Sequence, residues 1–351
     1  LSIRRQRQMC IRDSASGVQN FFMLKQIGRN PMIAQALAEM GYVGAVCVDF
    51  REALTMVENN VPIGNVGHLV QIPRAALKKI LSAKPKIVTV YSLEKAQEIS
   101  RVCTELGLHQ KLMLRVLGEN DMLYSGQYGG FTLAELEQTV HAIENMPGVE
   151  VGGVCSFPCF LYDEAAGDIL PTPNLSTVQT AARMLTAWGY KDLMRNTPSA
   201  TCVHSIPKIA AAGGTHGEPG HGLTGTTPYH AAHPDAEERP GYLYISEVSH
   251  DLGTKSYCYG GGHYRRGHMK NALVGTTLED AKIVPVLPPD DSSIDYHFEL
   301  QQNCPVSAAA VMAFRTQFFV TRSRVAVVKG LSEGKPELAG LYSALGDPAR
   351  E

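Results

Sequence analysis

The sequence predicts an α/β protein: a (β/α)8 TIM-type barrel over residues 15–228, followed by a mainly β C-terminal domain over residues 229–351. Three observations predict it. Short apolar runs alternate with amphipathic stretches, which is typical of βαβ units and a parallel sheet. These runs number eight, as a closed barrel of this type requires. After Thr226 the helical pattern fades, and short alternating runs replace it.

The barrel elements are predicted in chain order from apolar runs that end at polar or turn residues. The first strand is Phe21–Lys25, and the last two are the segments that carry Ser199 and Glu218. The other predicted strands are Ala45–Asp49, Pro62–Leu69, Ile87–Tyr91, Leu112–Val116 and Val151–Cys155. The predicted helices are Met32–Met40, Ala75–Ser82, Leu93–Leu106, Leu133–Asn145 and Thr177–Ala187.

The second domain is predicted from strands of alternating polarity separated by turn residues. Its clearest strands are Tyr242–Val248, Lys282–Val286 and Arg324–Val328. Tyr229–Pro240, with two histidines and two prolines among polar residues, is predicted to be an exposed connection between the domains.

Composition excludes several classes of function. The chain has 351 residues, 44% of them hydrophobic, and a formal charge of −2, so neither nucleic acid nor a charged membrane surface is indicated as a partner. No apolar stretch is long enough to span a bilayer. The eight cysteines include no Cys-x-x-Cys pair, which favours a reducing cytoplasm. The twelve histidines show no metal-binding spacing, so we predict no metal.

The first fourteen residues, Leu1 to Ser14, carry four arginines and no apolar periodicity. A transit peptide is one interpretation. The other is that the run Arg7 to Ser14 resembles translated sequencing-adapter DNA and is not native. On this interpretation the native segment before the lysine strand is missing, and we expect exposed apolar surface and poor dimerisation.

Lys25 ends the first predicted strand, directly after the apolar run from Phe21 to Leu24. In a parallel barrel, the carboxyl ends of the strands carry the chemistry. A partly desolvated amine there loses its proton more readily and can form an imine. Taken alone, a lysine that ends a strand and points to solvent is the simpler interpretation.

A loop far downstream changes this balance. Residues Gly213 to Leu223 combine glycines, Glu218 and a proline-fixed turn, and the segment Asn196 to Thr201 adds two hydroxyl groups. Glycines let backbone N–H groups approach an anion closely. A lysine, a carboxylate and a phosphate site are the three features that pyridoxal 5′-phosphate (PLP) requires.

These motifs resemble the fold-type III PLP enzymes typified by alanine racemase, and within them the YhfX family. The likeness extends from Phe21 to about Gly346. The segments that carry it are Leu24–Pro31, Gly67–Pro73, Leu170–Leu175, Pro198–Thr201, Glu218–His221, Tyr257–Gly262, Asp291–Tyr296 and Phe314–Gln317.

The resemblance implies roles for individual residues. Lys25 would hold PLP as an imine and serve as one catalytic base. Ser199, Gly220 and His221 would bind the phosphate. Tyr259 would reach the cofactor of the partner subunit as the base on the opposite face, in a homodimer whose active sites are shared across the interface. Without the resemblance, Tyr259 is an ordinary aromatic of a β-strand.

Three departures from the racemase pattern matter. Glu218 stands where racemases set an arginine near the pyridine nitrogen, as in the decarboxylase branch. A carboxylate there keeps that nitrogen protonated and strengthens the electron sink. Arg29 replaces a tyrosine and could pair with phosphate. Ser156 replaces a histidine that often stacks on the ring, from which we expect weaker cofactor packing.

Two further strand-end residues are candidates. His68 could contact the cofactor or the substrate, or be a satisfied core histidine. Arg115 could bind the substrate carboxylate, or pair with a nearby acid. Arg265 and Arg266 read as a solvated turn, and Asp291 and Asp295 could complete the site across the dimer interface.

The predicted function is a PLP-dependent, racemase-like enzyme that abstracts the Cα–H of an amino-acid substrate through Lys25. The alternative is a decarboxylase or lyase of the same fold. A third interpretation is a PLP-homeostasis protein with little turnover; relatives of that kind are single barrels, whereas this chain has a second domain.

Overall fold

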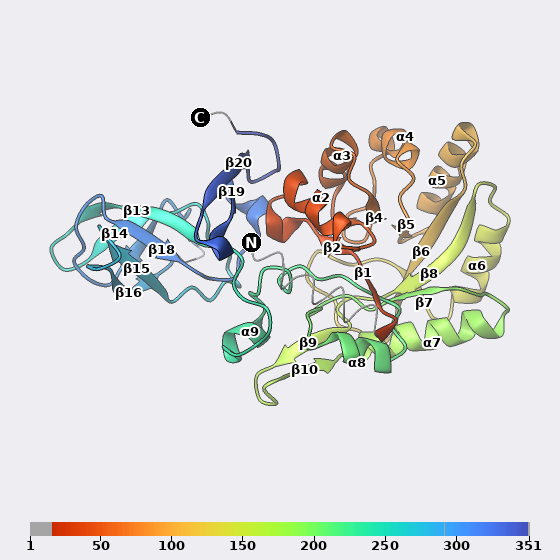
Figure 1. The fold of residues 1–351 in the computed structure, drawn as a ribbon. Coiled ribbons are helices and arrows are strands. Elements are labelled where there is room, and N and C mark those ends of the chain that lie inside the picture. The colour runs from red at the N-terminus through yellow and green to blue at the C-terminus, as the bar shows by residue number, and fades with distance from the viewer. Residues whose placement is uncertain (1–15, 291, 350–351) are drawn as a thin grey trace.

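The computed structural model describes residues 16–290 and 292–349. Figure 1 shows a barrel of strands surrounded by helices, with a β-rich domain beside it. The segment predicted to be non-native, residues 1–14, lies outside the described residues, and so does Asp291.

Eight parallel strands form the barrel. The first of them is interrupted by one residue and therefore carries two labels, β1 and β2. Only Phe21 separates β1 from β2; β1 pairs with β12, and β2 pairs with β3. The sheet therefore closes on itself, and the predicted (β/α)8 barrel is confirmed. Its strands are β1 (Gln19–Asn20), β2 (Phe22–Met23), β3 (Ala45–Cys47), β4 (Ile63–Val66), β5 (Ile87–Val90), β6 (Gln110–Leu117), β8 (Val149–Cys155), β11 (Met194–Asn196) and β12 (His216–Gly217), with β7 (Phe131–Thr132) paired to β6.

Helices connect the barrel strands, and the five predicted ones are present. They are α2 (Pro31–Glu39), α4 (Arg74–Ser82), α5 (Leu93–Leu106), α6 (Leu136–Glu144) and α7 (Pro173–Ala187). Sequence analysis missed α8 (Ile206–Ala211) and α3 (Phe50–Glu58). Asp49, predicted to end a strand, instead caps α3 by accepting a hydrogen bond from the Glu52 N–H at 2.9 Å.

The C-terminal domain is a closed antiparallel β-barrel, which confirms the predicted β domain. Its strands are β13 (Tyr244–Asp251), β14 (Ser256–Tyr259), β17 (His297–Leu300), β16 (Lys282–Leu287), β15 (Asn271–Gly275) and β18 (Ala309–Met312), given in spatial order. Alternate side chains such as Val248, Phe298 and Met312 point inward and form a separate apolar core. A final hairpin, β19 (Arg324–Lys329) and β20 (Glu337–Ser343), follows the short helix η2 (Phe318–Val320), and η3 (Leu331–Glu333) joins its strands.

The connection predicted at Tyr229–Pro240 is mostly exposed, but the barrel holds it firmly. It begins in α9 (Pro228–Ala232) and is anchored by two buried side chains, His230 and Glu238. Glu238 lies 3.1 Å from His230 Nε2 and accepts a hydrogen bond from the Val203 N–H at 2.7 Å. This segment is therefore part of the barrel surface and does not behave as a loose linker.

Among residues 16–290 and 292–349, no helix is long and apolar enough to cross a membrane. The seven cysteines of this part of the chain are all buried free thiols. No cluster of three or more potential metal ligands occurs within the same residues.

The Glu238 anchor predicts a pH-dependent stability. Burial alone would raise the pKa of Glu238, but hydrogen bonds from His230 and the Val203 N–H lower it below 4.5. A lowered folded pKa stabilises the protein above the unfolded pKa, and this contribution disappears as the pH falls through the folded pKa. We expect Glu238→Gln to cost about 1–3 kcal/mol near neutral pH and progressively less towards about pH 4. Urea unfolding of both proteins at several pH values measures the difference, and a pH-independent difference would contradict it.

Candidate active site

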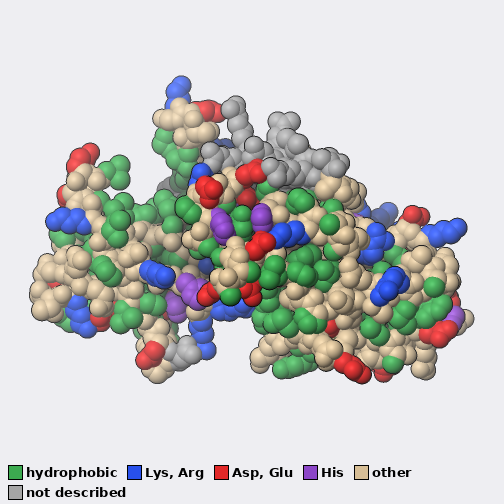
Figure 2. All heavy atoms as spheres, turned by 90° about the horizontal axis from the view of Figure 1, so that it is seen from below, with side chains coloured by type: hydrophobic (Ala, Val, Ile, Leu, Met, Phe, Trp, Pro, Cys, Tyr) green, Lys and Arg blue, Asp and Glu red, His purple; other side chains and the backbone are tan. Residues whose placement is uncertain are grey.

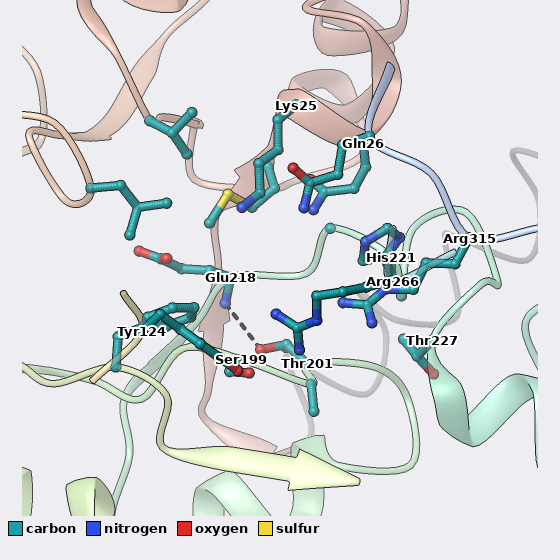
Figure 3. A pocket seen from close by; sticks show the side chains of 18 of the residues that line it. Lys25, Gln26, Tyr124, Ser199, Thr201, Glu218, His221, Thr227, Arg266 and Arg315 are labelled. Atoms are coloured by element: carbon teal, nitrogen blue, oxygen red, sulfur yellow. Dashed lines mark hydrogen bonds between the residues drawn. The ribbon is translucent and has the colours of Figure 1, made fainter. Parts of the chain in front are cut away.

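A cavity of about 560 Å³ opens at the carboxyl ends of the barrel strands. Figure 3 shows side chains from both domains converging on it. This volume is typical of a site for a small ligand. The hairpin of β9 (Phe160–Asp163) and β10 (Asp168–Pro171), which sequence analysis missed, forms one wall through Leu161, Tyr162 and Ile169.

Lys25 projects into this cavity from the end of the first barrel strand. The strand stops at Met23, and Lys25 begins the short helix η1 (Lys25–Ile27). Burial lowers the pKa of the Lys25 amine; Arg315 and Arg266 also lower it, against Glu52 and Glu218, which raise it. The amine is therefore available in its neutral, nucleophilic form at lower pH than an exposed lysine.

Glu218 enters the same cavity from the end of the last barrel strand. Its Oε1 accepts hydrogen bonds from Asn65 Nδ2 at 3.1 Å and Asn196 Nδ2 at 2.7 Å. The Thr89 hydroxyl donates to Asn65 Oδ1 at 2.8 Å, which orients the Asn65 amide towards Glu218. Among the described residues, Glu218 Oε2 has no hydrogen-bond donor. Oε1 is thus held in place, while Oε2 can accept a further hydrogen bond.

The predicted phosphate-binding segments also meet at the cavity. Ser199, Gly220 and His221 all line it. Ser199 and Ala200 both have positive φ angles, 92° and 49°, which are strained for non-glycine residues and typical of functional loops. Within residues 16–290 and 292–349, the backbone N–H groups of Gly220 and His221 have no acceptor. These N–H groups are available to an anion.

Arg29 does not reach this site, contrary to the expectation that it binds phosphate. Its guanidinium pairs with Asp49 at 2.7 Å and with Glu52 at 3.3 Å, and it stacks over Phe319. Arg29 is absent from the cavity lining. A buried arginine with two carboxylate partners already has its charge compensated, so it has no reason to bind a further anion.

Arg115 and His68 are also displaced from their expected places. Arg115 is buried and does not line the cavity; it lies over the Tyr91 ring and donates to the Gln127 carbonyl at 2.8 Å, while its Nε and Nη1 have no acceptor among the described residues. His68 is buried 3.7 Å from Glu218 Oε2 and does not line the cavity. Burial lowers the pKa of His68 and favours a neutral ring there.

Tyr259 lies on β14, outside the cavity of its own chain. Its side chain is 52% exposed and tilts against His297. Asp295 is not free in this chain either, because it accepts hydrogen bonds from the Gly261 and His263 N–H groups and pairs with Arg322.

Sequence analysis missed several residues of the site. Asn65 and Asn196 could have been identified from the sequence, because each is a polar residue at a buried position of a barrel strand. No pattern in the sequence indicated that Arg266 and Arg315 reach the barrel cavity, because both come from the C-terminal domain. Tyr124 and Tyr264 likewise line the cavity without any motif in the sequence.

The residues of this cavity fit PLP, the cofactor that the sequence motifs indicate. The Lys25 amine with its lowered pKa suits a carbonyl carbon, Glu218 Oε2, which has no donor among the described residues, suits a protonated ring nitrogen, and the N–H groups of Gly220 and His221 suit a phosphate. The three features lie in one cavity of suitable volume.

Known proteins match most of the chain. The alanine racemase N-terminal domain family matches residues 5–228, and the YhfX-like C-terminal domain family matches residues 243–338. The protein of Escherichia coli (strain K12) described as "Uncharacterized protein YhfX" is 45% identical over 333 residues, which cover 94% of this chain and 86% of that protein.

Solved structures share the fold at low identity. D-threonine aldolase from Filomicrobium marinum has a TM-score of 0.66 at 13% identity, covering 98% of this chain and 92% of its own. Alanine racemase of Clostridium difficile 630 has a TM-score of 0.64 at 14% identity, with coverages of 93% and 92%. Diaminopimelate decarboxylase from Helicobacter pylori has a TM-score of 0.60 at 14% identity, with coverages of 90% and 85%. On the family matches and the identity to the E. coli protein, this chain belongs to the YhfX family, within the alanine racemase-like, fold-type III group.

Proposed function

We propose that this protein is a PLP-dependent enzyme that abstracts the Cα proton of an amino acid, as racemases do. The observation that carries the proposal is the convergence of the Lys25 amine and the Glu218 carboxylate in one cavity. They come from the first and last barrel strands, which barrel closure makes neighbours. Family membership supports the same conclusion, because characterised fold-type III proteins of this kind are enzymes.

Bound PLP would supply an electron sink that stabilises the negative charge left on Cα when its proton departs. Lys25 would bind the cofactor and, with its lowered pKa, take or return that proton at Nζ. Glu218 Oε2 would accept a hydrogen bond from the ring nitrogen and keep it protonated, while Asn65 and Asn196 hold the other oxygen in place. Ser199 and the N–H groups of Gly220 and His221 would orient the phosphate.

A racemase also requires a base on the opposite face, and we propose Tyr259 of a partner subunit for that role. Tyr259 is exposed and cannot serve its own cavity, so the assignment requires a homodimer. The C-terminal domain has an apolar row that suits an interface. Ile245, Val311, Leu273 and Ile283 are paired in register across four strands, and the two isoleucines are each 71% exposed. Figure 2 shows hydrophobic side chains among those exposed on this domain.

Decarboxylase or lyase chemistry is the second candidate. Glu218, in place of a racemase arginine, favours it because a protonated ring nitrogen strengthens the electron sink for any bond broken at Cα. If the partner's tyrosine lies elsewhere, no second base would serve the opposite face, and the same electron sink would instead favour loss of CO2 from Cα or of a leaving group from Cβ. The second domain, which has a core of its own, argues against a PLP-homeostasis role.

The cysteines of the described residues are buried free thiols, which favours a cytoplasmic location.

Covalent labelling tests the role of Lys25. After incubation with PLP and borohydride, we expect peptide mass spectrometry to find the cofactor on Lys25 and the visible absorption of bound PLP to be lost. Lys25→Ala should abolish the label, whereas the matched variant Lys79→Ala, an exposed lysine paired with Glu58, should retain it. A wild-type protein that carries the label on other lysines but not on Lys25 would contradict the assignment.

The lowered pKa of Lys25 adds a pH signature to this experiment. Because the neutral amine reacts, labelling of Lys25 should persist at pH values where labelling of exposed lysines has already declined. Equal pH profiles for Lys25 and Lys79 would show that the Lys25 amine is not desolvated.

Glu218→Gln should separate cofactor binding from catalysis. The variant keeps the shape of the side chain but loses the negative charge that would stabilise a protonated ring nitrogen. We expect the Lys25 label to remain and α-deuterium exchange of an amino-acid substrate to fall about 10²–10³-fold. Nuclear magnetic resonance in deuterated water measures the exchange, and unchanged exchange would remove Glu218 from the mechanism.

Mixed dimers test the role of Tyr259. Lys25→Ala and Tyr259→Phe homodimers should each fail to racemise the amino acid, but a mixture refolded together should recover about one quarter of the wild-type racemisation rate. Recovery arises because each mixed dimer contains one cavity with both native residues. If Tyr259→Phe alone keeps full racemisation, the opposite-face base is another group.

A further inference from the structure

Two guanidinium groups from the C-terminal domain face the barrel cavity of the same chain. Arg266 lies in the loop after β14, and Arg315 follows β18. Within residues 16–290 and 292–349, neither arginine pairs with a carboxylate; Arg266 stands 5.1 Å over the Tyr124 ring, and Arg315 stands 5.9 Å over the Tyr264 ring. Arg315 Nε is buried without an acceptor among these residues. Leaving a buried donor such as Arg315 Nε without an acceptor is costly unless an anion binds there.

The two arginines are held close together by their backbones. Gly267 lies against Arg315, and a Cβ at Gly267 would come within 2.7 Å of the carbonyl oxygens of both Arg315 and Tyr264. Only glycine permits this approach, which brings the loop of Arg266 onto the segment of Arg315. Gln317 fixes the intervening tyrosine by donating a hydrogen bond to the Tyr264 hydroxyl at 3.3 Å. The pair is therefore positioned before any ligand arrives.

The arginine pair lies at the end of the cavity where the phosphate-binding segments meet. Figure 3 shows the guanidinium of Arg266 beside Ser199 and Thr201, and Arg315 reaching towards His221 and Thr227. Besides burial, both arginines lower the pKa of His221. Arg315 and Arg266 also contribute to the lowered pKa of Lys25. The positive potential of the site is thus concentrated at this end, away from Glu218.

We propose that Arg266 and Arg315 bind the phosphate of the cofactor, so that the C-terminal domain closes the cofactor site of its own chain. The inference rests on the proposed function and adds to the hydroxyl and N–H groups of Ser199, Gly220 and His221. A phosphate monoester carries about −1.5 to −2 charges near neutral pH, which two guanidinium groups balance. Planar guanidinium groups also match phosphate oxygens in two-point hydrogen bonds. Binding PLP thereby ties the two domains together.

The test compares PLP with pyridoxal, which lacks only the phosphate. Both are titrated by absorbance into wild-type protein and into Arg266→Gln and Arg315→Gln. Each substitution should weaken PLP binding about 10-fold and leave pyridoxal binding unchanged. Arg265→Gln, which changes the exposed neighbour outside the cavity lining, should behave as wild type. Arg315→Lys should recover part of the loss.

The outcomes separate this inference from the proposed function. Neither guanidinium has a carboxylate partner to lose, so the variants should melt without cofactor at the wild-type temperature, which excludes misfolding as the cause. An unchanged ratio of PLP to pyridoxal affinity in both arginine variants overturns the inference while Lys25 labelling stands. If the ratio of PLP to pyridoxal affinity is unchanged but the arginine variants bind the amino acid more weakly, the two arginines bind the substrate carboxylate, and the inference is overturned. No labelling of wild-type Lys25 at any PLP concentration refutes the proposed function, and this inference with it.

Discussion

The site depends on the closure of the barrel by its first strand. Backbone hydrogen bonds from Phe21 to the Gly217 carbonyl and from Met23 to the Pro219 carbonyl continue the pairing beyond the end of β12. Because of them, Lys25 and Glu218, which are far apart in sequence, leave neighbouring strands at the same end of the barrel. The asparagines that orient Glu218 come from β4 and β11. A break in this pairing would separate the Lys25 amine from the Glu218 carboxylate, and the cavity would no longer bring together the two groups on which the proposed chemistry depends.

The cavity has charges of opposite sign at its two ends. At one end, Glu218 Oε2 has no hydrogen-bond donor among the described residues and lies beside His68, whose pKa is lowered by burial. At the other end lie two guanidinium groups with no carboxylate partner among the same residues, together with the backbone N–H groups of Gly220 and His221. A ligand with a cationic ring nitrogen and an anionic phosphate can satisfy both ends in only one orientation. Lys25 lines the same cavity and would be the amine that meets the carbonyl carbon of such a ligand.

Much of this architecture could be predicted from the sequence, because local patterns determine it. Apolar runs located six of the eight strand positions of the barrel, and the last two strands, β11 and β12, end shortly before Ser199 and Glu218, by which they were predicted. Lys25, Ser199, Glu218, Gly220 and His221 do share one cavity. The helix α3 was missed because Asp49 was read as the end of a strand, when it caps the helix that follows. Arg29 was assigned to the phosphate because it replaces a racemase tyrosine, but a sequence does not show which carboxylates take an arginine's charge. Asp49 and Glu52 compensate Arg29, and no local pattern indicates that pairing. Arg266 and Arg315 lay beyond prediction because they depend on how one domain docks on the other.

A crystal structure of the protein with PLP tests the central claim most directly. The account predicts continuous electron density from Lys25 Nζ to the cofactor, with the ring nitrogen within hydrogen-bonding distance of Glu218 Oε2 and the phosphate between Ser199 and the arginines of the C-terminal domain. Density for PLP at any other lysine, or a ring turned so that its nitrogen faces away from Glu218, would contradict it.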